Sequence, residues 1–249
     1  MKIVAIIPAR MGSSRFPGKI MKVVNGQPLI GYLLDRVERA KHINEAIVAT
    51  SQLAENDIIY EYCRSRNITC FRGEEDDVLA RIIGALDMLD TKIGVVVYGD
   101  CPLIDPTIID QITKFFTENI DFYDFVGNDL TTTWPPGMEV EVFSINALKH
   151  AHQRCEDPKI REHGTLFLRQ NPQLYRLYNF GAPPEFQRPD LEIEIDLPED
   201  LRVIQSILDY FSDQPNFGLA QIIKYLDCHP EITGLNNNLP RRWKEYRLK

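Results

Sequence analysis

Short, continuous apolar runs constrain the fold of this chain more than any other feature of its sequence. Ile3 to Ile7 is one such run and stops at Pro8, and Gly94 to Tyr98 is another, directly followed by Gly99-Asp100. Apolar runs without polar alternation are typical of parallel strands that are buried on both faces. These two segments are therefore expected to be buried strands.

Helical periodicity fills the interval between these runs. Ile30, Leu33, Leu34 and Val37 fall at i, i+3, i+4 and i+7, which is one face of an amphipathic helix. Further strands are predicted near 46–49 and 69–71, and further helices near 57–66 and 77–89. Strands that alternate with helices at this spacing predict an α/β fold with βαβ units and a mostly parallel sheet flanked by helices.

The second half of the chain has a different pattern. Strands are predicted at 139–143, which alternates as a half-exposed strand does, and at 191–195; helices are predicted after Pro198 and around 219–226, and the tail from Pro230 is expected to be loosely held. The chain contains no repeat or low-complexity linker, so we predict a single domain over 1–249. Its expected parts are a nucleotide-binding half (1–125), an acceptor and dimer half (126–211) and a C-terminal helix and tail (212–249).

Composition excludes several classes of function. The formal net charge of −8 disfavours a nucleic-acid-binding protein, whose surface is normally basic. The five cysteines are odd in number and include no CxxC pair, which argues against a disulfide framework or a zinc site and favours a reducing cytoplasm. No apolar run is long enough for a signal-peptide core or a membrane span, so a soluble protein with no membrane partner is expected.

The polar loop after the first strand, residues 8–19, is the most informative segment. It gathers three basic side chains, two glycines and two serines: Arg10, Arg15, Lys19, Gly12, Gly18, Ser13 and Ser14. Glycines let backbone N–H groups approach an anion closely, and guanidinium groups match phosphate oxygens. The loop is therefore either a triphosphate-binding loop or a solvated basic loop that closes a sheet edge. It contains neither a Walker A nor a GxGxxG pattern.

The string IPARMGSSRFPGK resembles the signature of the cytidylyltransferases that activate acidic sugars, of which CMP-KDO synthetase is the best known. The SSRFPGK variant is closer to the spore-coat polysaccharide (SpsF) branch of that family. In this family the loop wraps the phosphates of CTP. The resemblance implies nucleotide binding by Arg10, Gly12, Ser13, Arg15 and Lys19, with Arg10 and Lys19 also serving catalysis.

Two aspartates follow predicted strands at distant points of the chain. Asp100 ends the run 95–100, and Asp196 follows the predicted strand 191–195. Mg²⁺ needs only one or two protein carboxylates when substrate phosphates complete its coordination. Each aspartate could equally cap the helix that follows, as Asp105 before Pro106 is expected to do.

Family resemblance favours the metal role for both residues. GDCPL resembles the family's GDxP metal motif, and IDLPEDL resembles its second metal-binding segment. The matching ligands of Mg²⁺ are Asp100 and Asp196, with Asp100 also catalytic. Glu199 and Asp200 are expected in the first turn of the next helix, where negative charge suits the helix dipole.

The middle of the chain matches the family less closely. Residues 72–81 resemble the segment of the SpsF branch that stands where relatives carry a nucleotide-contacting loop, so Asp77 and Arg81 are candidate nucleotide contacts. These two residues could also form a surface pair at i, i+4.

Three further residues are candidates for acceptor binding. Glu139 and Glu141 would share one strand face and either bind sugar hydroxyls or form the wet face of an edge strand, which the alternation favours. His163 lies in a segment resembling the branch's REHxTP motif, with Leu166 in place of the proline. It could accept a proton or anchor a loop.

Together these resemblances imply a Rossmann-like, nucleotide-diphosphosugar transferase (GT-A-like) fold. They imply a Mg²⁺-dependent transfer of CMP from CTP to a sugar acid or sugar-phosphate-like acceptor, with release of pyrophosphate, in surface polysaccharide or spore coat biosynthesis. Family members are commonly dimers, so a homodimer is expected. The alternatives are a nucleotide-sugar-dependent glycosyltransferase, which would use a DxD-type motif, and a non-catalytic nucleotide- or sugar-binding protein.

Overall fold

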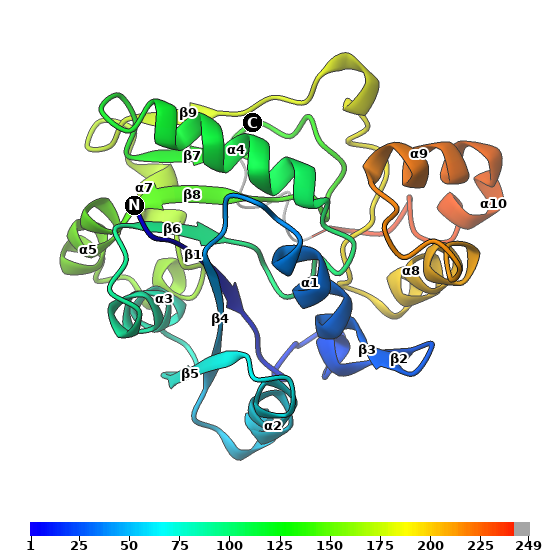
Figure 1. Ribbon diagram of the computed structural model, residues 1–249, viewed down its shortest axis with the longest axis horizontal. Coiled ribbons are helices and arrows are strands. Elements are labelled where there is room, and N and C mark those ends of the chain that lie inside the picture. The colour runs from blue at the N-terminus through cyan, green and yellow to red at the C-terminus, as the bar shows by residue number, and fades with distance from the viewer. Residues whose placement is uncertain (242–249) are drawn as a thin grey trace.

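A seven-stranded mixed sheet forms the centre of the protein in a computed structural model that describes residues 1–241 (Figure 1). Across the sheet the order is β5-β4-β1-β6-β8-β7-β9. The strands are β1 (Ile3–Pro8), β4 (Glu45–Ser51), β5 (Thr69–Gly73), β6 (Ile93–Val96), β7 (Phe125–Gly127), β8 (Glu141–Ser144) and β9 (Leu177–Asn179). A small hairpin is formed by β2 (Val23–Val24) and β3 (Gln27–Pro28).

Strand direction divides the sheet into two parts. β5, β4, β1 and β6 are parallel, with Ala5 opposite Ala46 and Val95. β8 is antiparallel to both β6 and β7, and β7 is parallel to β9. The predicted mixed, mostly parallel sheet is therefore confirmed.

Helices cover both faces of this sheet. The longer ones are α1 (Leu29–Glu38), α2 (Asp57–Ser65), α3 (Val78–Met88), α4 (Pro106–Glu118), α5 (Ile145–Arg154), α8 (Pro198–Tyr210) and α9 (Leu219–Cys228). Three short helices are α6 (Pro158–Arg161), α7 (Leu166–Gln170) and α10 (Pro230–Thr233), and 3-10 turns cover Lys19–Met21, Ala54–Asn56 and Pro184–Phe186.

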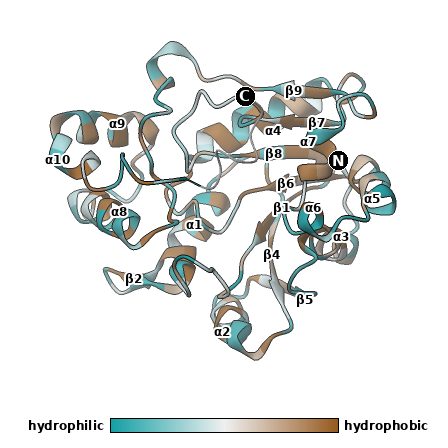
Figure 2. Ribbon diagram, turned by 180° about the vertical axis from the view of Figure 1, so that it is seen from behind, coloured by the Kyte–Doolittle hydropathy of each residue, from teal (hydrophilic) through white to brown (hydrophobic). Residues whose placement is uncertain are grey.

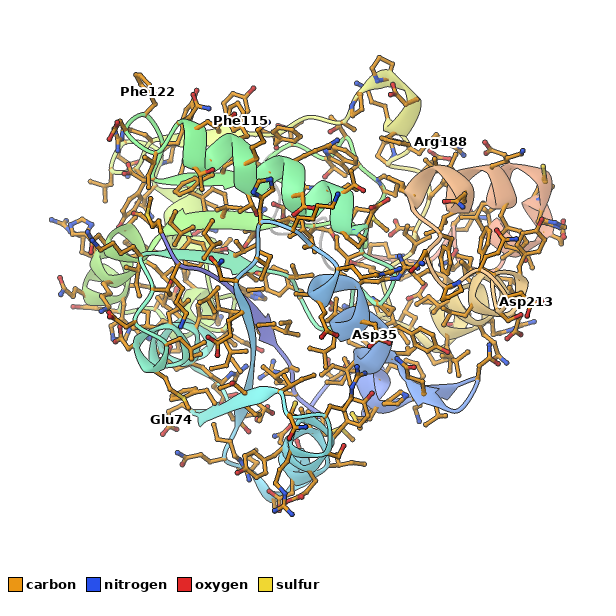
Figure 3. All side chains as sticks on the ribbon, in the orientation of Figure 1. Asp35, Glu74, Phe115, Phe122, Arg188 and Asp213 are labelled. Carbon is orange, nitrogen blue, oxygen red and sulfur yellow. The ribbon has the colours of Figure 1, made fainter. Side chains whose placement is uncertain are left out.

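Side chains of β1 show how the two faces are assigned. Ala5 and Ile7 pack with α1, α4, α8 and α9 in one apolar core, whereas Val4 and Ile6 pack with α3 and α5 in a second core. All four side chains are fully buried, and each isoleucine contributes about 1.5–3 kcal/mol by leaving water. The central strands are accordingly brown in Figure 2. Charged side chains such as Glu74 and Asp213 lie at the periphery (Figure 3).

Two expectations about the second half are wrong. Residues 191–195 are buried but form no strand, because their N–H groups bond to loop carbonyls: Ile193 N–H to Pro136 and Ile195 N–H to Asp100. The tail from Pro230 is not loosely held as far as residue 241, since Asn236 and Arg241 are buried and hydrogen-bonded. Its residues 242–249 lie outside the described range.

No helix within residues 1–241 combines the length and the apolar character needed to cross a bilayer.

Candidate functional site

A cavity of about 700 Å³ lies beyond the carboxyl ends of β1 and β6, where ligands of open α/β sheets bind. Its walls come from the 8–19 loop, the 98–101 turn, the segment 194–196, and the α6–α7 region. Ten of the predicted site residues line it: Arg10, Gly12, Ser13, Arg15, Lys19, Arg81, Asp100, Glu139, His163 and Asp196.

Hydrogen bonds fold the 8–19 loop on itself and tie it to the 3-10 turn Ala54–Asn56. The carbonyl oxygen of Met11 accepts from the N–H groups of Ser13 (2.8 Å) and Gly18 (2.9 Å), and Met11 N–H donates to Asn56 Oδ1 (2.7 Å). Gly18 has φ +68°, a left-handed conformation that glycine adopts readily. This turn starts the 3-10 segment at Lys19 and directs the basic side chains of the loop toward the cavity.

The turn that carries Asp100 is equally close to β1. Gly99 N–H donates to the carbonyl oxygen of Pro8 (3.2 Å), and a Cβ atom at residue 99 would lie only 2.9 Å from that oxygen. A glycine is needed here because the two strand ends approach so closely. The approach brings Asp100 next to the basic loop.

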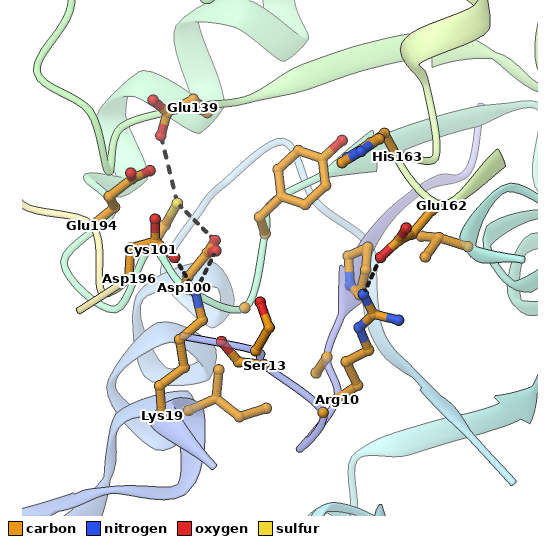
Figure 4. A pocket seen from close by; sticks show the side chains of 18 of the residues that line it. Arg10, Ser13, Lys19, Asp100, Cys101, Glu139, Glu162, His163, Glu194 and Asp196 are labelled. Atoms are coloured by element: carbon orange, nitrogen blue, oxygen red, sulfur yellow. Dashed lines mark hydrogen bonds and ion pairs between the residues drawn. The ribbon is translucent and has the colours of Figure 1, made fainter. Parts of the chain in front are cut away.

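Asp100 and Asp196 meet at the ammonium group of Lys19 (Figure 4). Lys19 Nζ lies 3.0 Å from Asp100 Oδ2 and 3.3 Å from Asp196 Oδ1. Arg15 forms an ion pair with the second oxygen of Asp196. The fold therefore brings together two aspartates, at positions 100 and 196 of the chain, and two basic residues of the loop.

Charge balance in this cluster depends on the ammonium group. Burial by itself would lower the pKa of Lys19, but Asp100 and Asp196 outweigh it and hold that pKa above its usual value, so Lys19 stays protonated. Burial, with the nearby charges of Glu139 and Asp100, raises the pKa of Glu194 well above its usual range. In this part of the cavity, acidic groups therefore surround the buried ammonium group of Lys19.

The donor set suits a hard divalent cation. Asp100 and Asp196 present carboxylate oxygens toward one point, which Lys19 Nζ occupies, and Mg²⁺ prefers oxygen ligands. Within residues 1–241, no three His, Cys, Asp or Glu side chains gather closely enough to hold a metal by themselves. Two carboxylates and substrate phosphates would have to supply the ligands together.

The next wall of the cavity contains Cys101 and Glu139. The Cys101 thiol lies 3.6 Å from Glu139 Oε2, and the same oxygen accepts from Gly137 N–H at 2.7 Å. Burial and the charge of Glu139 raise the pKa of the Cys101 thiol well above its usual range, so it remains protonated. Glu139 is therefore held in place at the edge of the Asp100 cluster.

The interpretation of Glu139 and Glu141 as the wet face of an edge strand is wrong. β8 lies between β6 and β7 and is not an edge strand, and Glu139 is 7% exposed and Glu141 0%. Glu141 accepts hydrogen bonds from Tyr98 OH (3.1 Å), Thr165 Oγ1 (2.6 Å) and Arg169 Nη1 (3.1 Å). Glu141 itself does not line the cavity, but two of its partners, Tyr98 and Arg169, do.

Arg169 is the cation of this second cluster. Its guanidinium joins Asp129 (2.9 Å) and Glu141 (3.1 Å), and it lines the cavity together with Tyr98 and Leu166. Burial and the charge of Asp129 raise the pKa of Glu141 to about 7, although Arg169 opposes this shift. Arg169, Asp129 and Tyr98 were not predicted from the sequence, because nothing local to them signals a site.

Arg10 bridges two walls of the cavity. Its Nη2 donates to Glu162 Oε1 at 2.6 Å (Figure 4). Its Nη1 lies 3.3 Å from Glu75 Oε1. The predicted surface pair of Asp77 with Arg81 is wrong. Asp77 instead caps α3 and pairs with Arg161 (2.5 Å) outside the cavity lining, and Arg81 is buried and donates to the carbonyls of residues 74 and 75.

Comparison with known proteins places this geometry in a family. The family model described as cytidylyltransferase matches residues 4–224, which include the basic loop and both strand-end aspartates. The chain belongs to the cytidylyltransferase family. The activity of this family is nucleotidyl transfer, as the resemblance of the loop and the two acidic motifs implied.

Two similar sequences match this chain over almost its whole length. An uncharacterised protein of Methanocaldococcus jannaschii is 32% identical over 99% of this chain and 98% of its own length. The spore coat polysaccharide biosynthesis protein SpsF of Bacillus subtilis is 29% identical over 92% of this chain and 95% of its own length. A 3-deoxy-manno-octulosonate cytidylyltransferase of Trichlorobacter lovleyi is 41% identical, but over only 48% of this chain and 46% of its own.

Solved structures show the same fold. A cytidylyltransferase of Leptospira borgpetersenii superposes with a TM-score of 0.90 at 28% identity, covering 97% of this chain and all of that one. A CMP-2-keto-3-deoxy-manno-octonic acid synthetase solved with CTP superposes with a TM-score of 0.62 at 17% identity, covering 84% of this chain and 99% of that one. The predicted Rossmann-like fold and the resemblance to the CMP-KDO synthetase and SpsF group are confirmed.

Proposed function

We propose that this cytidylyltransferase transfers CMP from CTP to a sugar acid or sugar-phosphate-like acceptor, with Mg²⁺, and releases pyrophosphate. The observation that carries the proposal is the meeting of Asp100 and Asp196 at Lys19, beside the basic loop. An oxygen of the acceptor would bond to the α-phosphorus of CTP, the bond from that phosphorus to the α–β bridging oxygen would break, and the acceptor proton would pass to solvent.

Basic residues of the loop would bind and stabilise the leaving group. Arg10, Arg15 and Lys19 line the cavity, and Gly12 and Ser13 add a backbone that can approach phosphate oxygens. The cationic groups of Arg10, Arg15 and Lys19 would stabilise the charge that develops on pyrophosphate as the bond breaks. Phosphoryl chemistry depends mainly on such positioning and electrostatics, so no nucleophilic side chain is required.

Asp100 and Asp196 would hold the metal. When bound, Mg²⁺ would neutralise phosphate charge and orient the reacting oxygens. Binding of the cation requires that Lys19 Nζ leave the position it holds between the two carboxylates, and the phosphates of CTP offer it a new anionic partner. Arg81 would contact the nucleotide from the opposite wall.

The acceptor would occupy the part of the cavity between Glu139, His163 and Arg169. Support for a sugar acid comes from the relative named as a 3-deoxy-manno-octulosonate cytidylyltransferase. The SpsF relative supports a role in polysaccharide biosynthesis. We also propose that the protein is a homodimer that uses the strands of the second half. We propose a cytoplasmic location, which the five free cysteines support.

Pyrophosphate release tests the proposal. The purified protein would be incubated with each of the four nucleoside triphosphates, Mg²⁺ and a panel of 2-keto sugar acids and sugar phosphates. We expect release with CTP and one class of acceptor, and loss of this release in Asp100→Asn. Silence over the whole panel, with a folded protein, would contradict the proposal. Light scattering of the same sample gives the oligomeric state.

A further inference from the structure

Arg241 is distant from the cavity lining in sequence, yet its side chain is buried beside the helix that follows Asp196. Its guanidinium donates to both oxygens of Asp200, from Nη1 to Oδ2 at 2.9 Å and from Nη2 to Oδ1 at 2.8 Å. Arg241 is 5% exposed and Asp200 0%. Such bidentate pairs are the most directional charged contacts in proteins.

Asp200 connects this pair to the cavity. Its Oδ2 also accepts from the backbone N–H groups of Asp196 (2.9 Å) and Leu197 (2.7 Å). Asn236 Nδ2 donates to Asp200 Oδ1 (2.7 Å) and to the carbonyl oxygen of Glu192 (2.9 Å). The backbone at Asp196 is therefore held by a carboxylate that two residues of the C-terminal region hold in turn.

The segment 191–196 belongs to no sheet, and Lys19 and Arg15 pair with the Asp196 carboxylate itself. The segment has no strand ladder, and Ile195 N–H bonds to the carbonyl oxygen of Asp100 (2.8 Å). The Asp200 carboxylate adds a further anchor, directly at the backbone N–H groups of Asp196 and Leu197.

We infer that Arg241 and Asn236 are positioning residues for the carboxylate of Asp196, acting through Asp200. The inference rests on the proposed function only in taking Asp196 as a metal ligand. Without the guanidinium, the buried carboxylate of Asp200 loses the charge that compensates it. The Asp200 carboxylate would then turn toward water and release the N–H group of Asp196. The carboxylates of Asp100 and Asp196 would no longer be held in the relative position that the metal requires.

Binding of Mn²⁺ as a substitute for Mg²⁺, in the presence of CTP, measures this role without turnover. Free Mn²⁺ would be followed by electron paramagnetic resonance in the wild type and in Arg241→Met, Arg241→Lys and Asn236→Ala. The matched control is Arg36→Met, which removes another buried guanidinium, one that donates to the carbonyls of Ile104 and Phe217. Circular dichroism fixes a temperature at which every variant is folded.

We expect Arg241→Met to weaken Mn²⁺ binding by about ten-fold or more, the usual effect of losing a group that orients a metal ligand. Arg241→Lys and Asn236→Ala should show smaller losses in the same direction, and they carry the test if Arg241→Met does not fold. Arg36→Met should unfold at a lower temperature and keep wild-type Mn²⁺ affinity.

Two results would overturn the inference. One is wild-type Mn²⁺ affinity in folded Arg241→Met; the other is an equal loss of affinity in Arg36→Met, which would mark a general effect of destabilisation. Absence of Mn²⁺ binding by the wild type would overturn it too. Wild-type protein that binds Mn²⁺ but releases no pyrophosphate would reject the proposed transfer alone, and the Mn²⁺ series would still support the positioning role.

Discussion

Lys19→Met should destabilise the metal-free protein and make its stability depend on Mg²⁺. The ammonium group lies 3.0 Å and 3.3 Å from two carboxylates that would otherwise repel each other. Breaking a fully buried pair costs about 3–5 kcal/mol, whereas an exposed pair contributes about 0–1 kcal/mol. The side chains of Asp196 and Asp100 are 10% and 34% exposed, so the site lies between these limits. We expect a loss of about 2 kcal/mol.

Urea denaturation and thermal unfolding measure this loss. For a domain of this size, about 2 kcal/mol corresponds to a fall in Tm of about 4–8 °C. If Mg²⁺ binds as proposed, it would neutralise the same carboxylates that Lys19 does, so the cation should raise the stability of Lys19→Met more than that of the wild type. The exposed Lys41 provides the control, since Lys41→Met removes an ammonium group without uncovering a carboxylate pair.

Equal stability of Lys19→Met and wild type without Mg²⁺ would show that the ammonium group does not offset the repulsion between the two carboxylates. An equal gain from Mg²⁺ in the two proteins would show that the cation and the ammonium group do not share one position.

Three other predictions follow from the same geometry. Asp100→Asn should lower turnover at least about 100-fold with an unchanged circular dichroism spectrum, since an amide binds the cation poorly; near-wild-type turnover would remove Asp100 from the chemistry. Burial and Asp129 raise the pKa of Glu141 to about 7, so its protonated form adds stability that is fully present below an unfolded pKa of 4.5 and is lost as pH rises through 7. Glu141→Gln should remove this contribution to the free energy of unfolding, which is no more than about 3 kcal/mol. If the free energy of unfolding in urea changes with pH equally in the two proteins, the assignment is contradicted. Gly137→Ala should cost about 2 kcal/mol or more in urea, because residue 137 has φ +105° and its Cβ would lie 2.6 Å from the carbonyl carbon of Ile193; an unchanged midpoint would show that the loop adjusts freely.

The phosphate side of the site could be predicted from the sequence because its signals are local. A buried parallel strand followed by a basic, glycine-containing loop has one plausible position, at the carboxyl end of the sheet. Asp100 follows a second such strand, so the two features had to meet at the same edge. Lys19 and Asp100 lie together because β1 and β6 are parallel and are direct neighbours in the sheet.

The acceptor side could not be predicted because its arrangement depends on strand order and on distant partners. Alternation in 139–143 is the same for an edge strand and for a central strand, and only the pairing of β8 with β6 and β7 decides that Glu141 is buried. Arg169 pairs with Asp129 and Glu141 across 40 and 28 positions, and no local pattern marks such a pair. The extended segment 191–195 resembled a strand because burial and alternation do not reveal where N–H groups bond.

The fate of the α-phosphate of CTP tests the account most directly. Protein, Mg²⁺, acceptor and CTP labelled at either the α- or the γ-phosphate would be incubated, and the products separated by charge. Cytidylyl transfer would move the α-label to the acceptor as a CMP conjugate and the γ-label into pyrophosphate, and Asp100→Asn should do neither. Recovery of the α-label in CDP or free CMP, with none on any acceptor, would contradict cytidylyl transfer.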